Sequence, residues 1–454
     1  MMELNERILQ LLRERKFSEL KPIAASMNEV DLAEVFEELD TTELPILFRI
    51  LPKDLAAAAF AELDRDTKET LIHKLTDFEI RSVMDELFLD DTVDLIEEMP
   101  ANVVKRILSQ SDKETRKYIN DILKYPRDSA GSIMTIEYIS LHSDMTVAEA
   151  FEKIRKKAID SETIYTCYVT DNVNRLIGLV TAKKLMLSPK DITVGDIMDT
   201  NVIYSYTTDD REEVALKLTD YRFLALPIVD AEMRLVGIVT VDDAIDVIRE
   251  ETTEDIAKMA ATASSDVPYL KTSVFEIWKN RIPWLLILMV SGTFTSLILN
   301  VYESRLNAIS SVLFACVPMI MGTGGNCGSQ ASVTVIRSMS LGQLEGRDVL
   351  KVLLKELRAS ILLGVTLAAA CFVKLILLDN MLFGFDGYTP VRCAVVSAAL
   401  LLTVVLAKIV GCSLPFIAKL CRLDPAVVAS PFITTIVDVL SLMIYCMLAI
   451  AVLA

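Results

Sequence analysis

Five apolar segments in the second half of the chain limit its fold more than any other feature. They lie near residues 283–302, 308–336, 359–378, 391–411 and 431–453. Each is close to the ~20 residues that a helix needs to cross a bilayer. Because lipid offers no partners to backbone polar groups, we predict that this half forms an α-helical membrane bundle of five spans.

Basic residues in the connecting loops predict the orientation of these spans. Two loops are rich in them, with Arg337, Arg347, Lys351, Lys355 and Arg358 after the second span and Lys408, Lys419 and Arg422 after the fourth. The alternate loops carry one basic residue each near their ends. Loops rich in Lys and Arg stay in the cytoplasm. We therefore expect a multi-pass protein of the inner or plasma membrane whose C-terminus lies outside.

The charges of the first half predict a soluble, cytoplasmic region. Residues 1–265 contain 53 Asp and Glu against 32 Lys and Arg, whereas residues 266–454 contain 10 against 14. The first twenty residues lack the apolar run of a signal peptide, so we expect this half to stay in the cytoplasm. Phosphate binding needs clustered Lys and Arg, so an acidic half predicts cations rather than nucleic acid as partners.

Residues 1–130 have the pattern of a string of short helices. Apolar residues recur at helical spacing in similar units, such as the one from Leu32 to Leu39 and the one from Val93 to Met99. Prolines such as Pro45 stand where these helices would begin or end. We predict an all-α N-terminal domain wound as a small superhelix.

Residues 131–250 contain an internal duplication. Gly-Ser-Ile-Met at 131–134 returns as Gly-Asp-Ile-Met at 195–198, and Leu-Ile-Gly-Leu-Val-Thr at 176–181 returns as Leu-Val-Gly-Ile-Val-Thr at 235–240. The two copies resemble a tandem pair of CBS domains. The resemblance implies α/β domains at 131–194 and 195–250 that sense small ligands. A connecting helix at 251–280 would then lead into the membrane domain at 281–454.

The last span contains a carboxylate at mid-helix. Asp438 is the only acidic residue well inside any predicted span, and Thr434 and Ser430 precede it by one and two turns on the same face. A charge at this depth costs roughly 2.5–3.5 kcal/mol, so we expect it to face a cavity or a cation. An oxygen-lined stripe suits a hard cation. The alternatives are a structural hydrogen bond to a neighbouring helix and an ion pair with Lys374.

The second span is unusually rich in glycine. Four glycines follow Pro318 in short succession: Gly322, Gly324, Gly325 and Gly328. We predict that they break the helix and free carbonyl oxygens toward a protected, watery pathway. Asn326 and Gln330, one turn apart, would add side-chain oxygens. The alternative is close packing between helices through small residues.

Acidic residues gather in three places in the soluble half. They are Asp90, Asp91 and Asp94; Asp209, Asp210, Glu212 and Glu213; and Asp242, Asp243, Asp246, Glu250, Glu251, Glu254 and Asp255. In the third group, residues three, four or seven apart share a helical face. Their like charges oppose compaction unless cations neutralise them. The alternative is a solvated acidic face.

Three stretches of the membrane half carry a wider resemblance. Gly322–Gln330, Asp424-Pro425 and Ser430–Asp438 resemble the membrane signature of the MgtE family of magnesium channels, and the predicted domain order is also that of the family. The resemblance implies a homodimer in lipid with an Mg2+ pore between its subunits, where Asp438 holds a largely hydrated ion. The expected pore residues are Asp438, Thr434, Ser430, Asn326, Gly325, Gly328, Gln330 and Asp424.

The same resemblance implies a sensor. In MgtE channels, acidic residues at domain junctions bind cytosolic Mg2+ and hold the pore closed. The expected regulatory metal ligands are Asp91, Asp94, Asp210, Glu212, Asp243, Asp246, Glu250, Glu251, Glu254 and Asp255. Mg2+ would favour the closed state through its higher affinity for that state. Such a sensor would bind near millimolar, or about −4 kcal/mol per site.

Other ligands and activities are limited by the sequence. Thr240 and Asp243 match the ribose-contacting pattern of CBS domains, whereas the first copy has Lys184 in place of the aspartate. The pattern thus predicts at most one standard nucleotide site, for example for ATP. No nucleophile–base constellation or P-loop is visible, so we expect no enzyme. Two alternatives stay open, a secondary Mg2+ transporter or exchanger and a CBS-regulated membrane sensor without transport.

Overall fold

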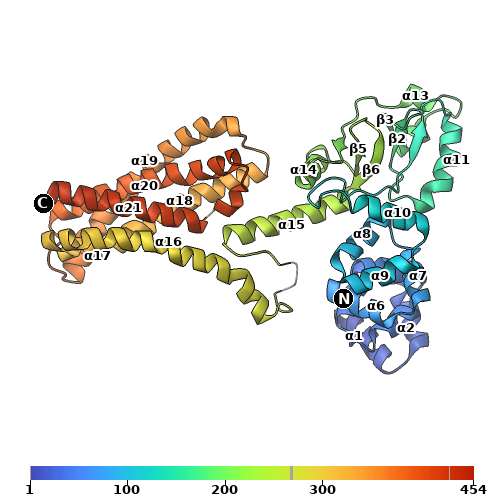
Figure 1. Cartoon of the computed structure of the whole chain (residues 1–454), viewed down its shortest axis with the longest axis horizontal. Helices are drawn as coiled ribbons and strands as arrows, with labels where there is room; N and C mark the ends of the chain where they lie inside the picture. Colours follow the sequence, from blue (N-terminus) through green and yellow to red (C-terminus); the bar gives the residue numbers. More distant parts are fainter. Residues whose placement is uncertain (1, 266–268, 429, 454) are drawn as a thin grey trace. The chain divides into compact units, whose positions relative to one another are not determined.

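The computed structural model describes residues 2–265, 269–428 and 430–453 (Figure 1). By its internal contacts the chain divides into two compact units, Met1–Ile248 and Arg249–Ala454. The first unit contains the predicted helical domain and the duplicated α/β region. The second contains the predicted membrane bundle.

The N-terminal domain is all-α, as predicted. Its helices are α1 (Met2–Arg13), α2 (Phe17–Ala24), α3 (Glu29–Glu37), α4 (Leu44–Ile50), α5 (Lys53–Ala61), α6 (Arg65–Lys74), α7 (Asp77–Met84), α8 (Leu89–Glu98), α9 (Ala101–Gln110) and α10 (Lys113–Ile122). Pro45 lies in the first turn of α4, and the Thr76 hydroxyl caps α7 in a capping box with Glu79. Helices two apart in sequence pack together from α1 to α9, which produces the winding of a superhelix.

The duplicated region forms two sheets of the same topology. The first copy has β1 (Ser140–His142), α11 (Val147–Lys157), η1 (Ala158–Asp160), β2 (Thr166–Thr170), β3 (Leu176–Thr181) and α12 (Ala182–Leu187). The second has α13 (Val194–Ile197), β4 (Ser205–Tyr206), α14 (Arg211–Tyr221), β5 (Ala225–Val229), β6 (Leu235–Thr240) and α15 (Val241–Met259). In each sheet the middle strand pairs parallel with the first and antiparallel with the third.

The repeated Gly-x-Ile-Met motifs are exchanged between the two copies. Met134 of the first motif and the following Thr135 lie against Gly237 in the second sheet, where Thr135 and Ile238 exchange backbone hydrogen bonds of 2.8 and 2.9 Å. Met198 of the second motif lies against Gly178 in the first sheet. A Cβ at either glycine would stand within 3.0 Å of the segment that carries the other copy's motif. The exchange explains why both the motif and the strand glycine are repeated.

The second unit contains the five predicted spans. Its elements are α16 (Val274–Ile309), α17 (Ser311–Ala315), α18 (Val317–Ser340), η2 (Gly346–Asp348), α19 (Val349–Lys374), the π-helical η3 (Leu375–Leu382), α20 (Pro390–Leu420), η4 (Pro425–Val428) and α21 (Ser430–Leu453). Five helical stretches are long and apolar enough to cross a membrane. The core of the bundle lies where α18, α20 and α21 pack on one another, with α19 against α20 and α16 against α21.

The predicted break in the second span is wrong. The α18 helix is continuous through its glycines, and their missing side chains let neighbouring helices approach. A Cβ at Gly324 would stand 2.7 Å from both Ser441 Oγ and Thr403 Cγ2, and a Cβ at Gly411 of α20 would collide with the Gly328 carbonyl oxygen. Tertiary packing therefore offsets the low helix propensity of glycine, and the small-residue alternative holds.

The assignment of Lys408 to a loop is also wrong. Lys408 lies inside α20 with 10% of its side chain exposed, and its Nζ is 3.2 Å from Glu356 Oε2 on α19. The helix continues to Leu420, so only Lys419 and Arg422 remain near the connection to α21. A buried cation of this kind is retained because it has an opposite charge beside it.

Candidate functional site

The intramembrane carboxylate lies at the contact between α21 and α18. Asp438 is half-buried, two turns after the start of α21. A Cβ placed on Gly325 of α18 would stand 3.5 Å from Asp438 Oδ1 and 3.3 Å from Thr434 Cγ2. Gly325 thus lets the backbone of α18 come close to the carboxylate. The Thr434 hydroxyl donates to the Pro431 carbonyl at 2.8 Å, so the lone pairs of its oxygen stay available.

The two structural alternatives for Asp438 are not found. Among the described side chains of residues 269–427 and 431–453, none forms a hydrogen bond or an ion pair with this carboxylate. Lys374 instead bonds Asp379 in η3, with 2.6 Å between Nζ and Oδ2. The Ser430 side chain lies outside the described part of the chain. A carboxylate at membrane depth without a protein partner is a candidate cation ligand.

A polar face of α18 is open in the single chain. Gly322, Asn326 and Gln330 follow one another at one-turn intervals, and all three are exposed. Gly324, Gly325 and Gly328 occupy the buried side of the same helix. Polar side chains at this depth disfavour contact with lipid tails. The face therefore suits water or a second polar surface.

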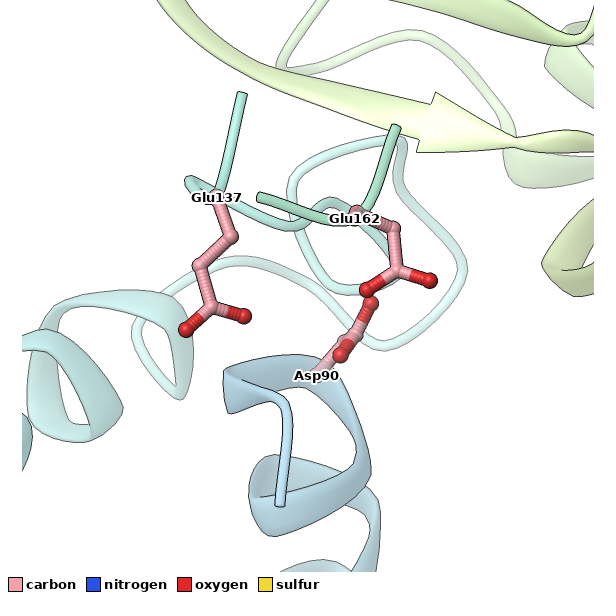
Figure 2. Close-up of side chains that lie close together, drawn as sticks. All are labelled: Asp90, Glu137 and Glu162. Carbon is pink, nitrogen blue, oxygen red and sulfur yellow. The ribbon is translucent and has the colours of Figure 1, made fainter. Parts of the chain in front are cut away.

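A second cluster of carboxylates lies within the first unit. Asp90 comes from the first turn of α8, Glu137 from the segment before β1, and Glu162 from the loop between η1 and β2. One oxygen of each lies within 4.8 Å of the others, and Figure 2 shows Asp90 rising from its helix toward Glu162. Glu137 Oε2 also accepts a hydrogen bond of 3.0 Å from the Leu89 amide at the start of α8.

Burial and like charges act together on this cluster. Burial, with the charges of Asp243 and Glu162, raises the pKa of Asp90 well above its usual range. Burial, with the charges of Asp242 and Asp243, raises the pKa of Glu162 to about 8. One Glu162 oxygen is buried without a hydrogen bond. These carboxylates destabilise one another when ionised, and a divalent cation would remove that repulsion.

Further carboxylates surround the cluster. Burial raises the pKa of Asp243 to about 6, although the Thr240 hydroxyl donates to its Oδ2 at 2.6 Å. Partial desolvation, with the charges of Asp243 and Asp91, raises the pKa of Asp94 to about 7. The Asp94 side chain nevertheless keeps contact with solvent, so the strongest effects belong to Asp90 and Glu162. Lys68 is the cation that opposes the rise in the pKa of Asp91 and Asp94.

The structure brings together only part of the predicted regulatory set. Asp91, Asp94 and Asp243 lie around the Asp90 cluster. Asp210 caps α14 by accepting from the Glu212 amide at 2.8 Å. Asp246 and Glu250 lie on exposed positions of α15.

The remaining predicted acidic residues lie in the second unit. Glu254 Oε1 and Asp424 Oδ2 are each 2.6 Å from Lys258 Nζ. Asp255 accepts from the Ser340 hydroxyl at 2.9 Å. Glu251 lies on the same helix, half-buried. This group surrounds a lysine.

Sequence reasoning missed Glu137 and Glu162. Both stand alone in loops of the first CBS copy, far in sequence from α8 and from the start of α15. No local signal marks them, because only the docking of the helical domain on the CBS pair places them beside Asp90. Asp90 and Asp242 belonged to recognised acidic runs but were not among the expected ligands.

Five apolar helices, an intramembrane carboxylate with no partner among the described side chains, and a soluble cluster of repelling carboxylates define a multi-pass membrane protein with two candidate cation sites. Comparison with models of known protein families supports this class. The MgtE divalent cation transporter model matches residues 317–448, the MgtE intracellular N domain model matches 27–128, and the CBS domain model matches 130–190 and 194–250. The chain belongs to the MgtE family of divalent cation transporters.

Relatives of nearly the same length support this assignment. The magnesium transporter MgtE of Thermus thermophilus is 36% identical over 440 residues, which cover 96% of this chain and 95% of the relative. The magnesium transporter MgtE of Bacillus subtilis is 31% identical over 444 residues, covering 98% and 96%. A crystal structure of the cytosolic domain of an Mg2+ channel MgtE in complex with ATP matches 54% of this chain and 99% of that chain, with 34% identity and a TM-score of 0.51.

Proposed function

We propose that this protein conducts Mg2+ across the cell membrane and that Mg2+ on the cytosolic side closes it. The observation that supports conduction is the Asp438 carboxylate, which lies at membrane depth and has no hydrogen-bond or ion-pair partner among the described side chains. It lies inside the segment that matches the divalent cation transporter model. The full-length relatives are named magnesium transporters.

In this proposal two copies form the pore. A second copy would cover the open polar face of α18 and leave a path between Asn326 and Gln330 of each subunit. Two Asp438 carboxylates would then bind Mg2+ through its waters, because Mg2+ gives up its hydration shell reluctantly. Thr434 and Ser430 remain proposed pore residues, whereas Asp424, which the sequence placed with them, is bonded to Lys258. Gly325 and Gly328 contribute close packing of α18 against α21 and not free carbonyl oxygens, since α18 is continuous.

The buried cluster supports the gating part of the proposal. Without a cation, burial and the charge of Asp243 raise the pKa of both Asp90 and Glu162, so docking the helical domain on the CBS pair is costly. Mg2+ would neutralise them and favour the docked arrangement by its differential affinity. Asp243 lies in the first turn of α15, whose last turns belong to the membrane unit. A cation that fixes this helix would thereby act on the membrane unit.

Orientation and nucleotide binding complete the proposal. The soluble half would lie in the cytoplasm and the C-terminus outside, as the loop charges predict. ATP would bind the second CBS copy, where Thr240 and Asp243 are bonded to each other at 2.6 Å. A relative's cytosolic domain crystallised in complex with ATP supports this ligand.

The test is Mg2+ flux into proteoliposomes that carry the purified protein. A channel would give flux down the Mg2+ gradient alone, and that flux would fall as sensor-side Mg2+ approaches millimolar. Flux that requires an opposing Na+ or H+ gradient would replace the channel by an exchanger. No flux under either condition would leave a membrane sensor.

A further inference from the structure

Lys258 occupies the centre of the acidic group at the end of α15. Its Nζ lies 2.6 Å from Glu254 Oε1 in the preceding turn and 2.6 Å from Asp424 Oδ2 in the connection between α20 and α21. The Lys258 side chain is 26% exposed, and those of Glu254 and Asp424 are 39% and 36% exposed. One ammonium therefore bonds two carboxylates that are far apart in sequence.

The surrounding contacts make this a docking point for α15 on the membrane bundle. Asp255 accepts from the Ser340 hydroxyl at the end of α18, and Met259 packs against Ile336 and Ala426. The second oxygen of Asp424, Oδ1, accepts from the Ala426 amide at 2.8 Å. Both Asp424 oxygens are thus used, one to shape the turn before η4 and the other to bond Lys258.

The Lys258 side chain keeps its positive charge. Partial burial disfavours the ammonium, but its hydrogen bonds to Asp424 and Glu254 outweigh burial and raise the pKa of Lys258. The residue stays charged at physiological pH. A covalently attached cation already stands where a divalent ion would otherwise bridge these two carboxylates.

We infer that the Lys258 ammonium holds α15 against the membrane bundle without Mg2+. It takes the place of a metal ion shared by Glu254 and Asp424. The regulatory consequence rests on the proposed gating, in which docked α15 favours the closed pore. Mg2+ sensing then falls to the Asp90 cluster, where one oxygen from each of three carboxylates lies within 4.8 Å of the others. Lys258 sets how firmly α15 is docked before any ion binds.

The first test measures docking directly. Hydrogen exchange of the amides at residues 249–259 is followed in the full chain in lipid nanodiscs without Mg2+. Lys258→Met should speed exchange about threefold, as expected for a partly exposed ion pair, whereas Lys258→Arg should stay near wild type. Asp424→Asn keeps an oxygen for the Ala426 amide and should act like Lys258→Met, with no added effect in the double variant. Lys351→Met, which removes an exposed lysine paired with Asp348, is the matched control.

The second test measures regulation in proteoliposomes. Lys258→Met should raise the sensor-side Mg2+ that halves the flux by about threefold, because docking loses one bond. A shift to lower Mg2+ would show that Lys258 competes with a metal ion and would overturn the inference, as would unchanged exchange in Lys258→Met. A wild-type flux that sensor-side Mg2+ does not reduce would overturn the proposed gating instead. The two failures are therefore distinguishable.

Discussion

Glu162 should make Mg2+ binding depend steeply on pH. Burial and the charges of Asp242 and Asp243 raise its pKa from 4.5 to about 8, so it keeps its proton at neutral pH when no cation is bound. An Mg2+ ion that takes this carboxylate as a ligand must displace the proton. Binding should therefore release a proton and strengthen as the pH rises.

The size of the effect follows from the pKa. With a pKa of about 8, about 3% of Glu162 is ionised at pH 6.5 and about 75% at pH 8.5. The apparent dissociation constant should fall about 25-fold over this range, or about 1.9 kcal/mol. Because the folded-state pKa lies above the unfolded one, the ion-free protein should also lose stability as the pH rises from about 4.5 to about 8. Saturating Mg2+ should restore that stability.

The assay is calorimetric titration of Mg2+ into the full-length protein in detergent. Two buffers with different heats of ionisation report the protons released, of which Glu162 should contribute about one per ion near pH 7. Glu162→Gln should remove that proton and weaken the pH dependence, while Asp90 still contributes to both. Glu152→Gln, which alters an exposed glutamate paired with Arg155, should behave like wild type. Affinity that does not change between pH 6.5 and 8.5, or wild-type pH dependence in Glu162→Gln, would refute the reasoning.

Three further predictions concern the membrane bundle. Asp438→Asn should abolish selective Mg2+ flux in proteoliposomes while size-exclusion chromatography still shows a folded dimer, and wild-type flux in this variant would remove Asp438 from the mechanism. Gly411→Ala forces a Cβ into a backbone carbonyl of α18 and should destabilise the bundle by about 1–3 kcal/mol in thermal unfolding. Gly322→Ala meets nothing within 4 Å and should not; equal effects would contradict this packing. Lys408→Met should cost about 3–5 kcal/mol by leaving Glu356 buried and unpaired, and adding Glu356→Gln should recover most of it. A double variant as unstable as the single would show that the ion pair is not the cause.

The spans and the duplicated domains were predictable because each depends on local pattern. Long apolar segments report helices in lipid directly, and the repeated Gly-x-Ile-Met motif reports two similar units. The glycine-rich stretch of α18 was misread for the same reason, since local propensity predicts a break. Contacts of Gly324 with Ser441 and Thr403, from two other helices, keep the helix continuous, and no local pattern shows them.

The soluble site was only half visible in the sequence. Asp90, Asp91 and Asp94 stand out as an acidic run, whereas Glu137 and Glu162 are single residues in loops. They join the cluster because β1 and β2 are neighbours in one sheet and because the helical domain docks there. Lys258 was overlooked because an acidic run hides a single cation, although its spacing of four residues from Glu254 predicts an ion pair.

The central claim is that cytosolic Mg2+ binds the Asp90 cluster and thereby closes the Mg2+ pathway in the membrane. The most direct test compares wild type with the Asp90→Asn, Glu162→Gln double variant in proteoliposomes, measuring Mg2+ flux as sensor-side Mg2+ rises. The account predicts that wild-type flux falls steeply near millimolar Mg2+ and that the variant, which still conducts, needs a several-fold higher concentration. Identical inhibition curves for the two proteins would contradict it.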